Sequence, residues 1–206
     1  MNNTVGSREI ISLVLQSKKN QLLELTQSEY DILLGSVLGD GYITKRGRIQ
    51  IEQGSKQKAY LEWKYEMIKR ITSTRILIAE RKTSSGIKTV SYRFWTKQYF
   101  HSWRSDFYPL GIKIIPNEIE TMLSPVVLAV WFMDDGFLRK ENAVAIATDK
   151  FSEEDLEKIN RALLNRYKIE ASIVSRGRMY FGKDATRKFV EIISPYVIPS
   201  MRYKLP

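Results

Sequence analysis

The sequence predicts an α+β protein built from two similar halves, in which helices alternate with antiparallel β-hairpins. Two observations carry this prediction. The order helix, hairpin, helix, hairpin, helix occurs twice along the 206 residues. A similar nine-residue segment also occurs once in each half, LLGSVLGDG at 33–41 and LAVWFMDDG at 128–136. An internal repeat of this kind takes precedence over local assignments, so we expect two pseudo-symmetric halves.

The chain begins with an extension before the first repeated unit. Residues 8–25 are rich in Ile, Leu and Val, and we expect a helix that docks on the core. This predicts an N-terminal helical extension over residues 1–27.

The first half is expected to span residues 28–108. Its first helix starts at Ser28, which resembles a capping box, and ends at Gly41. Alternating polar and apolar residues predict hairpins, and apolar residues at helical spacing predict helices. The remaining elements are a hairpin at 42–53 around Gly47, a helix at 58–71, a hairpin at 75–97 that turns at 84–86, and a short aromatic helix stopped by Pro109.

A linker at 109–123 is expected to precede the second half, residues 124–206. Ser124 followed by Pro125 is a strong helix start, and that helix ends on Gly136. The same patterns predict a hairpin at 137–149, a helix at 151–167 capped by Ser152, a hairpin at 169–183 around Gly177, and a closing helix at 187–198.

Composition limits the classes of function. Lys and Arg number 33 against 23 Asp and Glu, so the net charge is +10, which favours a polyanionic partner. The chain has no Cys and one His, which excludes thiolate chemistry, disulfides and a multi-histidine zinc site. No stretch reaches membrane-spanning length, and the N-terminus does not resemble a signal peptide. We therefore expect an intracellular protein of the cytoplasm or an organelle matrix, neither secreted nor membrane-bound.

The repeated segments place acids at the ends of two apolar helices. If these helices pack on a pseudo-two-fold axis, with Gly35 and Gly39 on one contacting face, Asp40 and Asp135 meet at their C-terminal ends. Acids at this end oppose the helix macrodipole and repel each other, unless a cation lies between them. Oxygen ligands favour a hard cation such as Mg²⁺, and a basic chain with such a site suggests phosphodiester hydrolysis.

A single Asp-Gly pair is also a common helix stop, so either segment alone would be weak evidence. Two copies in matching context, 95 residues apart, are much harder to explain that way. Asp134 is the weaker candidate, because its counterpart in the first half is Gly39.

Both segments resemble the LAGLIDADG motif of homing endonucleases, with the acid in the eighth place. WFMDDG, the bridge Lys113 to Pro116 and the ending PYVIPSMRYKLP are similar to the monomeric, two-motif, intron-encoded type. One departure is that Val130 and Asp134 stand where the first motif has its packing glycines, so the helix interface should be asymmetric. The N-terminal extension is a second departure.

The resemblance implies a monomeric, site-specific endonuclease acting on double-stranded DNA, with two αββαββα halves whose sheets form a saddle over the major groove. It makes Asp40 and Asp135, with the backbone of Gly39 and Asp134, the metal ligands. It gives catalytic roles to Lys113 and Lys204, near the scissile phosphates, and to Gln53 and Asp149, in the water network. Mg²⁺ is the expected cofactor, Mn²⁺ should substitute for it, and Ca²⁺ should support binding with little or no cleavage.

Base recognition is expected on the polar faces of the strands, where Arg can read guanine and Gln adenine. The alternative is an ordinary half-buried sheet whose polar face contacts only water. Arg, Gln and Lys outnumber Asp and Glu on that face, which favours DNA binding. The expected DNA-binding residues are Tyr42, Thr44, Lys45, Arg46, Arg48, Gln50, Glu52, Arg81, Lys82, Lys88, Ser91, Arg93, Trp95, Lys97, Arg139, Lys140, Asn142, Arg176, Arg178 and Tyr180.

Two other classes of function stay open at this point. The same scaffold occurs in RNA maturases, which assist intron splicing, and in transcription regulators. Loss of a motif acid would favour a non-cleaving protein, but both acids are present, and splicing help can coexist with cleavage. An unrelated basic structural protein would leave the repeated Asp-Gly unexplained.

Overall fold

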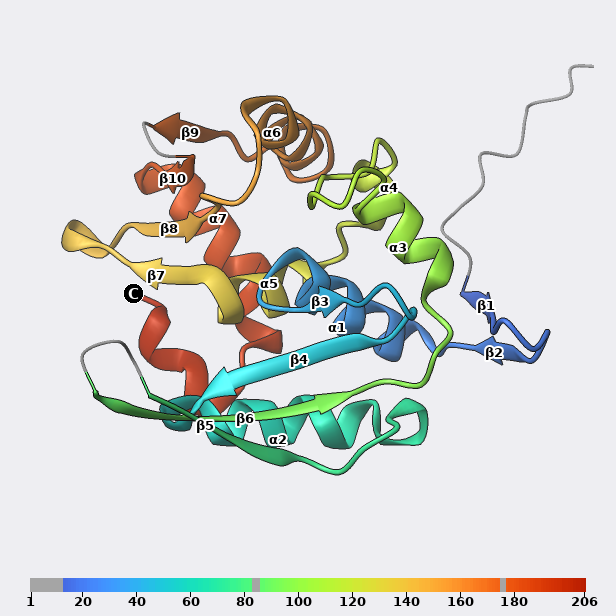
Figure 1. The fold of residues 1–206 in the computed structure, drawn as a ribbon. Helices are drawn as coiled ribbons and strands as arrows, with labels where there is room; N and C mark the ends of the chain where they lie inside the picture. The colour runs from blue at the N-terminus through green and yellow to red at the C-terminus, as the bar shows by residue number, and fades with distance from the viewer. Residues whose placement is uncertain (1–12, 83–85, 175–176) are drawn as a thin grey trace, which may run out of the picture.

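The computed structural model describes residues 13–82, 86–174 and 177–206, and it confirms the predicted α+β class with two similar halves (Figure 1). Each half contains a four-stranded antiparallel sheet, with strand order β3-β4-β6-β5 in the first and β7-β8-β10-β9 in the second. The two orders are equivalent. In each sheet the second strands of the two hairpins, β4 and β6 or β8 and β10, lie side by side in the centre. The chain therefore repeats one topology.

The first half follows the predicted order of elements. They are α1 (Gln27–Leu38), β3 (Tyr42–Ile43), β4 (Ile49–Gly54), α2 (Lys58–Met67), β5 (Leu77–Lys82), β6 (Lys88–Trp95) and α3 (His101–Phe107). Ile49 and Ile51 are buried while Gln50 and Glu52 on the opposite face are partly exposed, which is the alternation predicted for β4. The predicted turn at Ser84 and Ser85 lies outside the described residues.

The second half repeats this order after a short α4 (Ile119–Met122) in the linker. Its elements are α5 (Pro125–Asp135), β7 (Gly136–Leu138), β8 (Val144–Ala147), α6 (Glu153–Tyr167), β9 (Ala171–Val174), β10 (Arg178–Phe181), α7 (Lys183–Ile193) and the 3₁₀ segment η5 (Pro199–Lys204). Ser124 and Ser152 cap α5 and α6 through their side-chain oxygens, as predicted.

Strand register shows how closely the two halves correspond. Gln50 pairs with Trp95 in the first sheet, and Ala145, 95 residues after Gln50, pairs with Tyr180 in the second. Trp95 and Tyr180 are therefore equivalent positions. By the same register Arg93, opposite Glu52, corresponds to Arg178, opposite Ala147.

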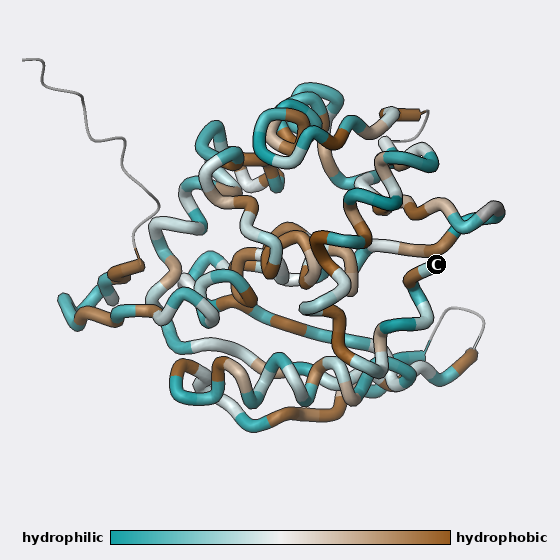
Figure 2. Tube along the Cα trace, turned by 180° about the vertical axis from the view of Figure 1, so that it is seen from behind, coloured by the Kyte–Doolittle hydropathy of each residue, from teal (hydrophilic) through white to brown (hydrophobic). Residues whose placement is uncertain are grey.

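The two repeated helices, α1 and α5, pack against each other in the middle of the molecule, where Figure 2 shows hydrophobic segments gathered. A Cβ on Gly35 would lie 2.6 Å from the Cβ of Val130, and a Cβ on Gly39 would lie 2.5 Å from the Cβ of Asp134. Both glycines therefore permit the close approach, and each faces a larger residue of α5. The asymmetric interface expected from the sequence is present.

The start and end of α1 differ slightly from the prediction. Thr26, and not Ser28, is the N-cap, because Thr26 and Glu29 form a reciprocal capping box. The helix ends at Leu38 with Gly39 as its cap, and the Gly41 N–H still reaches the Ser36 carbonyl at 2.6 Å. This hydrogen bond closes a turn over residues 36–41, and Asp40 therefore lies directly after the helix cap.

The predicted helical extension is wrong for the residues that the structure describes. Residues 13–26 contain a hairpin of β1 (Val14–Gln16) and β2 (Leu22–Glu24), and residues 1–12 lie outside the described part. Leu15 and Leu25 are buried, with Leu13 and Leu23 partly buried against the core, so the leucines follow a period of two. Asn20, at φ 58°, supplies the left-handed turn residue between the strands.

No helix among the described residues is long and apolar enough to cross a membrane.

Candidate active site

Asp40 follows α1 after the Gly39 cap and Asp135 ends α5, and the charge of Asp40 acts on Asp135. Burial, followed by the charges of Asp40 and Asp134, raises the pKa of the Asp135 carboxyl to about 7. Each of these neighbours is close enough to make ionisation of Asp135 more costly. Three carboxylates therefore gather where the C-terminal ends of two helices already concentrate negative potential.

Lys113 and Lys204 contact the two helix ends in matching ways. The Lys113 Nζ donates to the carbonyls of Leu38 and Gly39, at 3.3 and 2.9 Å. The Lys204 Nζ donates to the carbonyls of Met133 and Asp134, at 2.6 and 2.9 Å. Each ammonium therefore binds the two carbonyls that immediately precede one motif acid.

The surroundings of both lysines disfavour the charged form. Burial, with a smaller effect of Lys150, lowers the pKa of Lys113 to about 8. Burial also lowers the pKa of Lys204, while the nearby carboxylates oppose that change. At neutral pH Lys113 remains mostly protonated and close to its titration midpoint.

Gln53 and Asp149 occupy different surroundings. At the end of β4, Gln53 donates its side-chain amide to Asp40 Oδ2 at 3.0 Å and to Asp134 Oδ1 at 3.1 Å. Asp149 follows β8 and accepts from Arg178 Nε at 3.3 Å, with its side chain 45% exposed. The structure thus brings Gln53 to the acids, while it places Asp149 beside the β9–β10 hairpin.

Lys64 is a site residue that sequence reasoning missed. It lies on α2 with its side chain fully buried, and its Nζ donates to both oxygens of Asp134 at 2.7 and 2.9 Å. Its spacing from Leu61 and Ile68 places it in the apolar stripe of the helix. A lysine in such a stripe, together with an extra acid in an apolar helix, was the available signal.

The residues at this site fit a hard divalent cation held by two carboxylates. Asp134 already has an ion-pair partner in Lys64, whereas Asp40 and Asp135 repel each other, which a cation between them would relieve. Within the described ranges no cluster of three or more Asp, Glu, His or Cys side chains is arranged for metal binding. Remaining ligands would be backbone carbonyls, water or substrate oxygens, as Mg²⁺ commonly accepts.

The polar face of the first sheet carries a connected network around Glu52. Its carboxylate accepts from Arg81 at 2.5 and 3.0 Å, from Ser91 at 2.5 Å and from Gln50 at 3.1 Å. Burial opposes ionisation, but the hydrogen bonds from Arg81 and Ser91 outweigh it and lower the pKa of Glu52. The network holds several predicted DNA-contacting side chains in defined positions.

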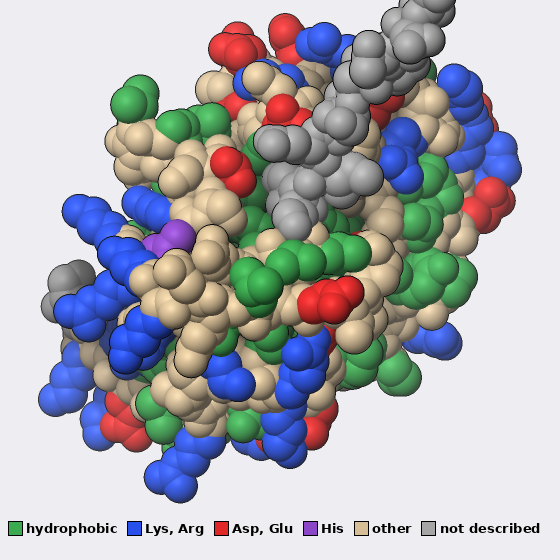
Figure 3. Space-filling view, turned by 90° about the vertical axis from the view of Figure 1, so that its right-hand side faces the viewer, with side chains coloured by type: hydrophobic (Ala, Val, Ile, Leu, Met, Phe, Trp, Pro, Cys, Tyr) green, Lys and Arg blue, Asp and Glu red, His purple; other side chains and the backbone are tan. Residues whose placement is uncertain are grey.

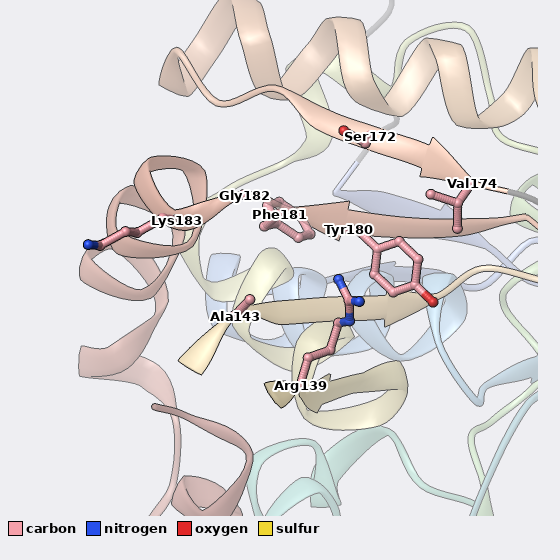
Figure 4. Close-up of a pocket in the computed structure, with 8 residues that line it drawn as sticks. All are labelled: Arg139, Ala143, Ser172, Val174, Tyr180, Phe181, Gly182 and Lys183. Carbon is pink, nitrogen blue, oxygen red and sulfur yellow. The ribbon is translucent and has the colours of Figure 1, made fainter. Parts of the chain in front are cut away.

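Arginine side chains on both sheets lie over aromatic rings. The Arg93 guanidinium lies 5.0 Å from the centre of the Trp95 ring, and that of Arg139 lies 4.0 Å from the Tyr180 ring. Figure 4 shows Arg139 against Tyr180 beside a cavity of about 660 Å³ that Ser172 and Val174 also line. Stacking fixes the plane of a guanidinium, which helps bidentate hydrogen bonding.

The other predicted DNA contacts are mostly exposed. The side chains of Tyr42, Lys45, Arg46, Lys82, Lys88, Lys140 and Asn142 are exposed, and Thr44, Arg48 and Arg178 are partly exposed. Lys97 is also exposed, but its Nζ donates to the Arg70 carbonyl at 2.7 Å. Arg176 lies outside the described residues.

Many Lys and Arg side chains are exposed on the face of the molecule drawn in Figure 3. Lys and Arg side chains gather along the left of Figure 3, which is the side that faces the viewer in Figure 1. The Nε atoms of Arg48 and Arg93 are buried and have no hydrogen-bond partner within the described part of the protein. His101, by contrast, is partly buried against Gly47.

The chain belongs to the LAGLIDADG DNA endonuclease family, whose model matches residues 30–189. Its sequence is 29% identical to the cytochrome b mRNA maturase bI2 of Saccharomyces cerevisiae, with 97% of this chain and 53% of the relative aligned. It is 27% identical to the DNA endonuclease I-ChuI of Chlamydomonas applanata, over 89% of this chain and 96% of the relative. The chain thus spans about half the length of the first relative and almost all of the second.

The fold also matches a solved complex, that of the homing endonuclease I-WcaI bound to its DNA recognition sequence. The TM-score is 0.81 at 26% identity, and the match covers 92% of this chain and 90% of the other. The predicted membership of the homing endonuclease family is thereby confirmed.

Proposed function

We propose that this protein is a site-specific endonuclease that binds a long double-stranded DNA target through its two sheets and hydrolyses one phosphodiester in each strand. The observation that carries the proposal is the paired arrangement at the ends of α1 and α5. An acid stands at or just after the end of each helix, Asp40 or Asp135, and a lysine binds the two carbonyls that precede it. Two equivalent reaction centres are what double-strand cleavage requires.

Asp40 and Asp135 would hold the divalent cation, for which we propose Mg²⁺. When bound, such a cation lowers the pKa of a coordinated water and stabilises the leaving oxygen. Gln53 orients the Asp40 carboxylate through its side-chain amide. Lys113 and Lys204 place positive charge beside the two acids, where it stabilises the charge that develops on the phosphate.

The two sheets would supply DNA affinity and sequence recognition. Exposed cations such as Lys45, Arg46 and Lys88 suit phosphate contacts, which position the protein without reading sequence. Arg93 and Arg139, stacked on aromatic rings, suit the bidentate reading of guanine in the major groove. The similar fold of a homing endonuclease solved with its DNA recognition sequence supports DNA as the partner.

The experiment is cleavage of a plasmid library of randomised sequence in Mg²⁺, followed by sequencing of the cut ends. We expect one extended sequence to be enriched around paired strand breaks, and no cleavage in EDTA. Random breakage, or intact plasmids under conditions where the folded protein binds DNA, would refute the proposal.

A second candidate is a role in RNA splicing, which the likeness to the cytochrome b mRNA maturase favours. Competition binding distinguishes the two. Preference for a structured intron RNA over every duplex in the library, together with absent cleavage, would select the maturase function. Tight binding of both would indicate a dual role.

A further inference from the structure

Asp134 belongs to the second half but contacts the reaction centre of the first. Its Oδ2 accepts from the backbone N–H of Asp40 at 3.3 Å. Its Oδ1 accepts from Gln53 Nε2, the same nitrogen that donates to Asp40 Oδ2. One carboxylate therefore touches both the backbone of Asp40 and the amide that orients its side chain.

Lys64 binds both oxygens of this carboxylate. Lys64 and Asp134 both have fully buried side chains, and the two hydrogen bonds between them are short. The Lys64 Nζ also lies 4.4 Å from the centre of the Tyr60 ring, and the Tyr60 hydroxyl donates to the Val130 carbonyl at 3.1 Å. The pair thus joins α2 of the first half to α5 of the second.

The pair occurs on one side of the pseudo-two-fold axis. Residues 95 positions away from Asp134 and Lys64 are Gly39 and Ile159. Gly39 has no side chain to offer Asp135, and Ile159 is buried in α6 as an ordinary core residue. Each half therefore carries one charged residue, Lys64 or Asp134, where the other half has an uncharged one. These two charged residues contact each other.

We propose that Asp134, held by Lys64, is a positioning residue for Asp40, so that the second half sets the geometry of the first half's acid. The inference rests on the proposed nuclease function for its catalytic consequence. Its structural basis is the acceptor oxygen that Asp134 presents to Asp40 and Gln53. Burying an ion pair costs desolvation energy, and such a pair often stabilises a fold no better than an apolar pair of similar volume. Stability alone therefore does not account for Lys64 and Asp134, whereas the positioning of Asp40 does.

Two double variants separate the acceptor oxygen from the ion pair. Lys64→Met/Asp134→Asn and Lys64→Met/Asp134→Leu both remove the buried charges and keep similar volume, so both should fold. Only the Asn variant retains an acceptor oxygen for the Asp40 N–H, while its side-chain NH2 takes the place of the oxygen that accepts from Gln53 in the wild type. Ile159→Met is the matched control, because it places a methionine at the position of α6 that is equivalent to Lys64 of α2.

The first readout needs neither metal nor DNA. Hydrogen exchange of the Asp40 backbone amide, followed by NMR in the metal-free protein, should be about 10-fold faster or more in the Leu variant than in the Asn variant. Protection of Gly39 and other α1 amides should stay equal, because the helix is unchanged.

The second readout is cleavage of a matched target under single-turnover conditions. The Leu variant should cleave up to about 100-fold more slowly than the Asn variant, with duplex affinity in Ca²⁺ changed by less than about 3-fold. Gln53→Leu, which leaves the ion pair intact, should also slow cleavage but preserve protection of the Asp40 amide.

Equal Asp40 exchange and equal cleavage in the two double variants would overturn the inference. If the Leu variant does not fold, Lys64→Met/Asp134→Ala, which also lacks the acceptor oxygen, takes its place in both comparisons. A wild-type protein that cleaves no target would defeat the proposed function, and the exchange measurement would still decide whether Asp134 positions Asp40.

Discussion

Replacing Asp135 with asparagine should stabilise the metal-free protein at neutral pH. Burial, then Asp40 and Asp134, raise the pKa of this carboxyl from 3.8 to about 7. Between about pH 4 and pH 7 the native state therefore binds more protons at Asp135 than the unfolded chain. The free energy of unfolding of the wild type should fall as pH rises through this window and level off above it.

The size of the effect follows from the same pKa. A rise from 3.8 to about 7 corresponds to at most about 4 kcal/mol of lost stability. Asp135 is partly exposed, so water screens part of this, and about 2 kcal/mol is a reasonable expectation. For a chain of this length that is about 4–8 °C in Tm.

Thermal unfolding in EDTA at pH 4.5 and pH 7.5 measures this difference. Asp135→Asn should unfold at the higher temperature at pH 7.5, and the gap should largely close at pH 4.5. Glu157→Gln, at an exposed position of α6, removes an equal charge and should show no such pH dependence. An Asp135→Asn protein less stable than wild type at pH 7.5 would refute the crowding of carboxylates inferred for this site.

Three further predictions concern packing, catalysis and binding. Gly35→Ala should destabilise by about 2 kcal/mol or more in chemical unfolding, since its Cβ would meet Val130 at 2.6 Å, whereas Gly54→Ala, with open space around it, should be nearly neutral; equal effects would contradict the close helix contact. Cleavage should fall above about pH 8 as Lys113 deprotonates, and Lys113→Arg should move that limb to higher pH if the variant is active; an unchanged alkaline limb would exclude Lys113 as its source. Arg93→Ala should weaken binding to the cognate duplex more than to random DNA, and salt titration of both affinities would contradict base reading if the two losses are equal.

The repeat made much of this fold predictable from sequence. Helices α1 and α5 are marked by apolar residues and by an Asp-Gly end, and each copy supports the other. The hairpins follow from strict alternation, as Ile49 and Ile51 against Gln50 and Glu52 show. Local pattern and pseudo-symmetry pointed to the same architecture, which is when such inference works best.

The features that escaped prediction depend on contacts between distant segments. Leu13, Leu15, Leu23 and Leu25 fit a helix in composition, but their period of two and a turn at Asn20 give a hairpin. Lys64 looks like a solvated charge until α2 is placed against α5, where its partner lies 70 residues further along the chain. Sequence periodicity gives the buried face of an element but not the residue it meets.

The paired-acid account is tested most directly by Asp40→Asn and Asp135→Asn, assayed separately on a matched target. Each variant should lose at least about 100-fold in cleavage rate in Mg²⁺, equivalent to about 2.7 kcal/mol in the barrier. Duplex affinity in Ca²⁺, measured by gel shift, should stay within about 3-fold of wild type, because the sheets are unchanged. Full cleavage by both variants would contradict the account, and so would full cleavage by wild type in EDTA.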